Sequence, residues 1–224
     1  MIETIGMSYK ATCVALSLYV SSPSLQILLL MISQCVIRKL NDGIQPLADR
    51  IMTLVLQLIQ SAGKTSTVLE DAFLVVGSLA SGNILLLSFS SYAFLNNMQP
   101  IALESNFIPY IQAFQHYLYP ALKAHEDTQL CTVAVGIIGD ISRALGEQSA
   151  QYANSFMTVL LENLQSDVLN RNVKVSILSC FGDIALAIGP AFEPYLETTL
   201  GVLRQAGAIE PNPVSPVFSL PPES

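Results

Sequence analysis

The sequence is poor in charge. Of its 224 residues, 12% are Asp, Glu, Lys or Arg, 51% are hydrophobic, and none is tryptophan. Soluble domains average about 25% charged residues, so this chain has little charge with which to solvate a large surface. The net charge of −7 leaves no broad basic patch of the kind that nucleic-acid binding requires. The composition therefore favours a chain with extensive apolar contact surfaces, and its acidic balance favours basic partners.

Cysteine pairs and long apolar runs are also lacking. The four cysteines are too far apart in the sequence to form a Cys-x-x-Cys pair, and we interpret them as reduced, buried thiols. The apolar stretches Leu25–Ile37 and Ile84–Leu95 are shorter than the roughly 20 residues that cross a membrane. We therefore expect no membrane association, and the reduced thiols favour the cytoplasm or the nucleus.

No motif for catalysis, cofactor binding or metal binding is found. Gly63-Lys64-Thr65 looks like the end of a phosphate-binding loop, but Leu58 stands where that loop requires glycine. His116 and His125 have no cysteine pair near them, which makes a zinc site improbable. The chain is therefore expected to have no enzymatic activity, no cofactor and no metal.

A repeat runs through the second half of the chain. Tyr110, Tyr152 and Tyr195 each follow an aliphatic residue and a turn, at spacings of 42 and 43 residues. Gly139-Asp140-Ile141 and Gly182-Asp183-Ile184 are also 43 residues apart. A period of about 40–47 residues is typical of HEAT and armadillo arrays, in which each repeat is a pair of helices. The sequence therefore predicts an all-α solenoid of HEAT repeats.

The apolar periodicity divides the chain into about four helical pairs. We expect first helices at 44–59, 106–123, 152–164 and 192–206, and second helices at 24–40, 68–81, 130–145 and 170–188. The HEAT array then covers 24–206, residues 1–23 are unassigned, and the proline-rich tail 207–224 is expected to be disordered. Because the N-terminal end is too apolar to cap an array, we expect a fragment or an aggregation-prone chain.

An insertion is predicted at 82–101. Met52–Ser61 matches Met157–Ser166 at an offset of 105 residues, which exceeds two repeats. Residues 82–101 carry no charge and interrupt a helical pattern. Their removal joins Ser81 to Ala102 and restores the turn before the tyrosine repeat. The insertion is either natural or a gene-model artefact such as a translated intron.

Six residues are candidate partner contacts: Asp140, Asp183, Glu70, Asp71, Phe114 and Phe156. Two of them, Asp140 and Asp183, occupy equivalent places in second helices. The preferred interpretation is ordinary helix solvation or a cap-like bond to the neighbouring repeat, and the alternative is an acidic row that binds a basic helix. Glu70 and Asp71 lie near a helix start, where complementing the helix dipole is a sufficient explanation. Most first-helix aromatics are expected in the core, with a minority edging shallow grooves that suit an apolar peptide.

Four segments resemble the middle-to-late HEAT repeats of the importin beta family: Ile44–Ile59, Leu69–Phe73, Ala134–Leu145 and Ser176–Gly189. The stretch Phe181–Gly189 is the most specific of them. The resemblance runs in order over 24–81 and 102–206, whereas 1–23, 82–101 and 207–224 resemble nothing in the family.

The resemblance implies a nuclear import receptor of the cytoplasm and nucleus. Such receptors bind a basic helix of the importin alpha adaptor or basic cargo, and they hold Phe-Gly nucleoporins between outer helices. The GTPase Ran, bound to GTP, causes the release of their load. The resemblance implies that Asp140 and Asp183 face the adaptor helix, and that first helices at 107–123, 150–166 and 192–206 border a Phe-Gly site. The family's principal Ran-binding repeats are missing from this sequence. A generic HEAT scaffold, such as a phosphatase or kinase regulatory subunit, is the alternative.

Overall fold

The computed structural model describes residues 23–40, 44–62, 67–81 and 107–207, and every regular element in these ranges is helical. The α-helices are α2 (Pro23–Leu40), α3 (Gln45–Ser61), α4 (Thr67–Ser81), α5 (Ile108–Leu122), α6 (Thr128–Leu145), α7 (Ala150–Leu164), α8 (Arg171–Ile188) and α9 (Glu193–Gly207). Two short 3-10 helices, η3 (Gly146–Ser149) and η4 (Gly189–Phe192), follow α6 and α8. The predicted all-α fold and its helical pairs are confirmed. The predicted insertion at 82–101 lies outside the described residues, as do nearly all of 1–23 and 207–224.

Local sequence signals set the ends of the helices. Asp127 caps α6 by accepting a hydrogen bond from the backbone N–H of Leu130 at 3.0 Å, which satisfies a donor that the first turn leaves unpaired. Asn170 caps α8 in the same way. Gly146 and Gly189 end α6 and α8 with φ values of 53° and 52°, a backbone conformation that glycine adopts without steric cost. These glycines turn the chain from each second helix into the next first helix.

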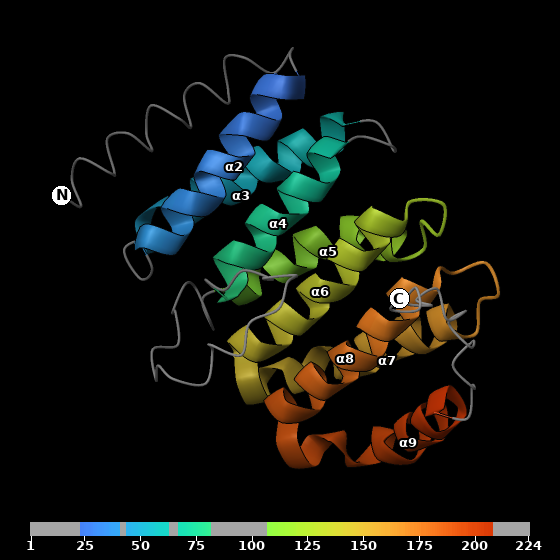
Figure 1. The fold of residues 1–224 in the computed structure, drawn as a ribbon. Coiled ribbons are helices and arrows are strands. Elements are labelled where there is room, and N and C mark those ends of the chain that lie inside the picture. Colours follow the sequence, from blue (N-terminus) through green and yellow to red (C-terminus); the bar gives the residue numbers. More distant parts are fainter. Residues whose placement is uncertain (1–22, 41–43, 63–66, 82–106, 208–224) are drawn as a thin grey trace, which may run out of the picture. The chain divides into compact units, whose positions relative to one another are not determined.

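The helices of residues 23–192 form two layers. The second helices α2, α4, α6 and α8 pack side by side in chain order, and α3, α5 and α7 pack against one another and against their partners in the pairs (Figure 1). A hydrogen bond joins two first helices, because the Tyr110 hydroxyl donates to Asp49 Oδ1 at 2.5 Å. Burial and this bond raise the pKa of Tyr110 to about 12. Tyr110, one of the three periodic tyrosines, therefore links two neighbouring helical pairs.

The core lies between the two layers. Phe73 of α4 and Phe114 of α5 meet edge to face, with ring centroids 5.1 Å apart, and so join successive helical pairs. The aliphatic residues of α6 are buried on nearly every side, because this helix packs against both α4 and α8. Each pair thus buries its apolar surface against its neighbours, as expected of a solenoid.

The chain divides into two compact units, Met1–Phe192 and Glu193–Ser224, and α9 belongs to the second. Among the described residues, the stretch Arg171–Ala206 contains an 18-residue window with a mean hydropathy of 1.7, which passes for a membrane span by length and composition. It comprises α8, η4 and α9. One such helix is weak evidence for a membrane span, and α8 packs against α6 within the solenoid.

Candidate functional site

An ion-pair bridge joins the two repeated aspartates. Arg143 contacts Asp140 of its own helix at 2.6 Å and Asp183 of α8 at 2.5 Å, each through one guanidinium nitrogen. Burial alone lowers the pKa of Arg143, but the bonds to Asp183 and the charge of Asp140 outweigh this and raise it. The bridge therefore joins α6 to α8, and so the repeated aspartates take part in the contact between neighbouring repeats.

The bridge leaves little carboxylate surface for a partner. The Asp140 side chain is 4% exposed and the Asp183 side chain 28% exposed. Cys180 lies in the same environment, and burial, reinforced by the charge of Asp183, raises the pKa of its thiol. Asp140 is thus enclosed in the helix interface, and Asp183 alone of the two retains a partly open face.

Two glycines of the second helices lie directly against these aspartate side chains. A Cβ atom added to Gly77 would lie 3.0 Å from Asp140 Oδ2, and one added to Gly139 would lie 2.7 Å from Asp183 Oδ2. The backbone of α6 at Gly139 therefore packs closely against the Asp183 side chain. Such close packing is not found at Gly182, where an added Cβ would have no neighbour within 4 Å. The equivalent glycine on α8 is exposed.

Phe114 and Phe156 do not edge a groove. Both side chains are 0% exposed, and Phe114 is fixed against Phe73. The prediction that they contact a partner is corrected here, because each ring fills space between packed helices. The other interpretation of the first-helix aromatics, that most belong to the core, fits these two residues.

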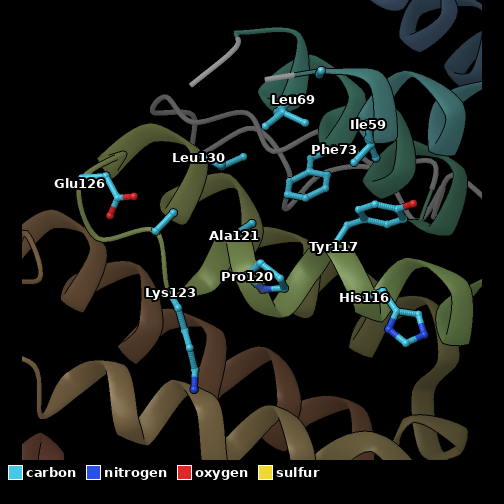
Figure 2. Close-up of a pocket in the computed structure, with 12 residues that line it drawn as sticks. Ile59, Leu69, Phe73, His116, Tyr117, Pro120, Ala121, Lys123, Glu126 and Leu130 are labelled. Atoms are coloured by element: carbon cyan, nitrogen blue, oxygen red, sulfur yellow. The ribbon is translucent and has the colours of Figure 1, made fainter. Parts of the chain in front are cut away.

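A cavity of about 300 Å³ opens between the ends of α3 and α5 and the beginnings of α4 and α6. Figure 2 shows the Phe73 and Tyr117 rings in its middle, with Leu69 and Leu130 toward one end. Ile59, Pro120 and Ala121 complete most of the apolar lining. A cavity of this size with aromatic walls suits a large apolar side chain.

One acidic residue, Glu126, is among those that line this cavity. Glu70 follows the lining residue Leu69 in the chain, and Asp127 follows Glu126. Burial raises the pKa of Glu70, and the charges of Asp127 and Asp71 raise it further; burial also raises that of Asp71. Glu70 and Asp71, which the sequence marked as candidate partner contacts, are not among the residues that line the cavity.

A polar clamp, formed by Asn163, His125 and Ser166, connects the loops of two repeats. The Asn163 side chain donates to the backbone carbonyl of Leu122 at 2.8 Å, and its oxygen lies 3.1 Å from His125 Nε2. Ser166 Oγ lies 3.2 Å from the other ring nitrogen of His125. Asn163 is buried, so these bonds satisfy an otherwise costly polar group. The clamp fixes the loop that carries Glu126.

Sequence reasoning missed Arg143, Asn163 and the cavity. Arg143 stands three residues after Asp140, a spacing that allows an ion pair on one helix, and this signal was available. Asn163 interrupts an otherwise apolar helix face, which is a weaker signal. The cavity had none, because its walls come from four helices whose contacts depend on tertiary packing.

A family model described as importin subunit beta-1-like, TPR repeats, matches residues 4–217. The chain belongs to this family. Importin subunit beta-1 of Schizosaccharomyces pombe is 41% identical over 178 residues, which cover 80% of this chain and 18% of that protein. Importin subunit beta-1 of Arabidopsis thaliana is 36% identical over 162 residues, covering 72% and 16%. The chain therefore spans less than a fifth of the length of these relatives.

Solved structures agree with the family. A crystal structure of importin beta superposes with a TM-score of 0.80 at 32% identity and covers 95% of this chain and 24% of its own. A structure of the Kap95:Nup1 complex superposes with a TM-score of 0.72 at 26% identity, covering 93% and 24%. Because importin beta structures match nearly the whole chain, the predicted importin-beta-type solenoid is confirmed.

Proposed function

We propose that this chain is a segment of a nuclear import receptor that moves between cytoplasm and nucleus, and that its cavity holds the phenylalanine of a Phe-Gly nucleoporin motif. The carrying observation is the apolar cavity beside neighbouring first helices α3 and α5. A related structure is that of Kap95 with Nup1, and this supports a nucleoporin as partner. Holding a peptide in an apolar cavity is a binding function and involves no catalysis.

The lining favours an aromatic ligand side chain. Phe73 and Tyr117 offer ring faces and edges, and Leu69 and Ile59 offer aliphatic surface. Leu69 and Tyr117 are partly exposed in the absence of a ligand. Covering such surface stabilises a complex by about 25 cal/mol per Å², so a small cavity gives weak binding to each motif. Weak individual contacts are suited to a receptor that binds many repeated motifs in succession.

Fluorescence anisotropy with a labelled Phe-Gly peptide tests this proposal. Leu69→Ser should weaken binding by about five- to tenfold, since it removes roughly 1 kcal/mol of apolar contact. Leu186→Ser is the matched control, because Leu186 is 86% exposed on α8 and does not line the cavity. Binding that both variants retain equally, or no binding by a chain that is helical by circular dichroism, would contradict the proposal. The latter result would favour a HEAT scaffold without transport activity.

The importin-alpha-type adaptor or basic cargo is a further proposed partner. Asp183 supports it, because this side chain keeps some exposed surface, whereas Asp140 is enclosed. A labelled basic helix should bind in a salt-sensitive manner. The exposed acid Glu147 provides a control of the same charge change: Asp183→Asn should weaken binding more than Glu147→Gln. Equal weakening by the two variants would indicate a general effect of net charge.

A further inference from the structure

A second hollow, of about 480 Å³, adjoins the cavity. The described residues that line it all belong to α5, and they are Gln112, Gln115, His116, Tyr119 and Pro120. His116 and Pro120 also line the cavity, and Figure 2 shows both beside it on α5. The two hollows therefore meet at these two residues, and a bound segment of chain that leaves the cavity across them enters the second hollow.

The second hollow is polar without being charged by an acid, a lysine or an arginine. The side chains of Gln112, Gln115 and Tyr119 make no hydrogen bond with any other residue that the structure describes. An amide side chain offers both a donor and an acceptor, as a peptide group does. This lining can therefore bond the N–H and C=O groups of an extended main chain, whichever side chains that main chain carries.

Pro120 adds a backbone acceptor at the boundary between the two hollows. It lies inside α5, and proline has no N–H with which to bond the carbonyl four residues earlier. That carbonyl belongs to His116, the other residue that both hollows share. Because His116 and Pro120 are both exposed, a peptide that crosses α5 here meets a carbonyl that has lost its regular helical donor.

We infer that the second hollow binds the main chain of the residues that flank the aromatic anchor, with one peptide N–H donating to the His116 carbonyl. This inference rests on the proposed function, and it adds to the apolar contact a second contact that does not depend on the flanking sequence. The cavity takes the phenylalanine ring, and the chain beside that ring crosses α5 and lies along Gln115 and Gln112.

The dimensions of α5 set the length of chain that the second hollow accommodates. Gln112 and Pro120 lie at its two ends along the helix, and the helical rise between them is about 12 Å. An extended chain spans about 3.3 Å per residue. About four residues on one side of the anchor therefore reach from one end of the hollow to the other.

Unlabelled peptides that compete with a labelled Phe-Gly peptide for the full chain test the inference. A capped Phe-Gly dipeptide measures the apolar cavity alone. Four alanines added before or after it supply main chain without polar side chains, and one of the two longer peptides should bind about three- to tenfold more tightly. Methylation of the alanine amide nitrogens removes the donors and should cancel that gain.

Pro120→Ala returns the N–H that the His116 carbonyl lacks, and so occupies this acceptor within α5. The ratio of the longer peptide's affinity to that of the dipeptide should fall by about two- to fivefold. Tm should not fall, because proline inside a helix is destabilising. Gln115→Ala should reduce the same ratio. Gln148→Ala is the matched control, because Gln148 is an exposed glutamine on η3 that lines neither hollow, and it should leave the ratio unchanged.

The ratio separates this inference from the proposed function, because loss of apolar lining weakens the dipeptide and the longer peptide alike. If the labelled Phe-Gly peptide itself does not bind, the proposed function fails and this inference with it. Equal affinities of the dipeptide and both longer peptides overturn the inference alone. A gain that survives both N-methylation and Pro120→Ala also overturns it, since the added contact would then not involve the main chain.

Discussion

Two glycines at equivalent positions should respond in opposite ways to the same substitution. Gly139 and Gly182 lie 43 residues apart in the second helices α6 and α8. Alanine is favoured over glycine in a helix interior by about 1 kcal/mol. At Gly182 an added methyl group meets nothing within 4 Å. Gly182→Ala should therefore stabilise the fold by about 0.5–1 kcal/mol.

At Gly139 the same methyl group meets Asp183. Its carbon would lie 2.7 Å from Oδ2, a distance too short for two non-bonded atoms, and 3.5 Å from an Arg143 nitrogen. Asp183 cannot retreat without losing its 2.5 Å contact with Arg143. Forcing a methyl group into packed surroundings costs about 1–3 kcal/mol, and the weakened ion pair adds to this cost. Because these losses exceed the gain in helix propensity, Gly139→Ala should destabilise the fold by about 1–2 kcal/mol.

Thermal unfolding followed by circular dichroism measures both effects. In a chain of this size, 1 kcal/mol corresponds to about 2–4 °C in Tm. Gly182→Ala should raise Tm by about 1–4 °C, and Gly139→Ala should lower it by about 2–8 °C. Gly77→Ala provides a graded test, because its Cβ would lie 3.0 Å from Asp140 Oδ2, and it should also lower Tm. If Gly139→Ala proved as stabilising as Gly182→Ala, close approach of α8 would not be what requires glycine at 139.

Three further predictions concern charge, thiols and the polar clamp. The pKa of Glu70 is raised above its ordinary 4.5, so the contribution of this group to stability is present below that pH and is lost as pH rises through the raised pKa. Glu70→Gln should therefore raise Tm at pH 7, and the gain should vanish near pH 4; a gain that is independent of pH would contradict this. Iodoacetamide should modify the exposed Cys35 before the buried Cys131 and Cys180. The reason is that burial raises the pKa of the Cys131 thiol to about 11 and also raises that of Cys180. Peptide mass spectrometry gives the order of modification, and equal rates in the native chain would refute the prediction. Asn163→Ala should lower the free energy of unfolding by about 1–3 kcal/mol in urea titrations, because it removes hydrogen bonds to the Leu122 carbonyl and to His125. Asn154→Ala, on the exposed face of α7, is the control and should change the free energy of unfolding little.

The sequence by itself determined the repeat and its helices. A 42- to 43-residue spacing of tyrosines and Gly-Asp pairs identifies stacked helical pairs. Asp127, Gly146 and Gly189 mark helix ends through local chemistry, because a cap bond or a positive φ involves only neighbouring backbone. Family resemblance is carried by the same ordered segments. These features depend on residues that are close in sequence, which is why the pattern alone was sufficient.

Tertiary structure decided what those residues do. The sequence left Asp140 and Asp183 between two interpretations, and the position of Arg143 between them showed that they join adjacent helices. Periodicity placed Phe114 and Phe156 on first helices, but only packing showed that both rings are enclosed. The cavity is lined by residues of four helices, and two of these residues, Ile59 and Leu130, are 71 positions apart in the sequence. The exposure of a side chain and the shape of a cavity depend on how helices far apart in the sequence stack on one another. A local pattern in one sequence does not determine that stacking.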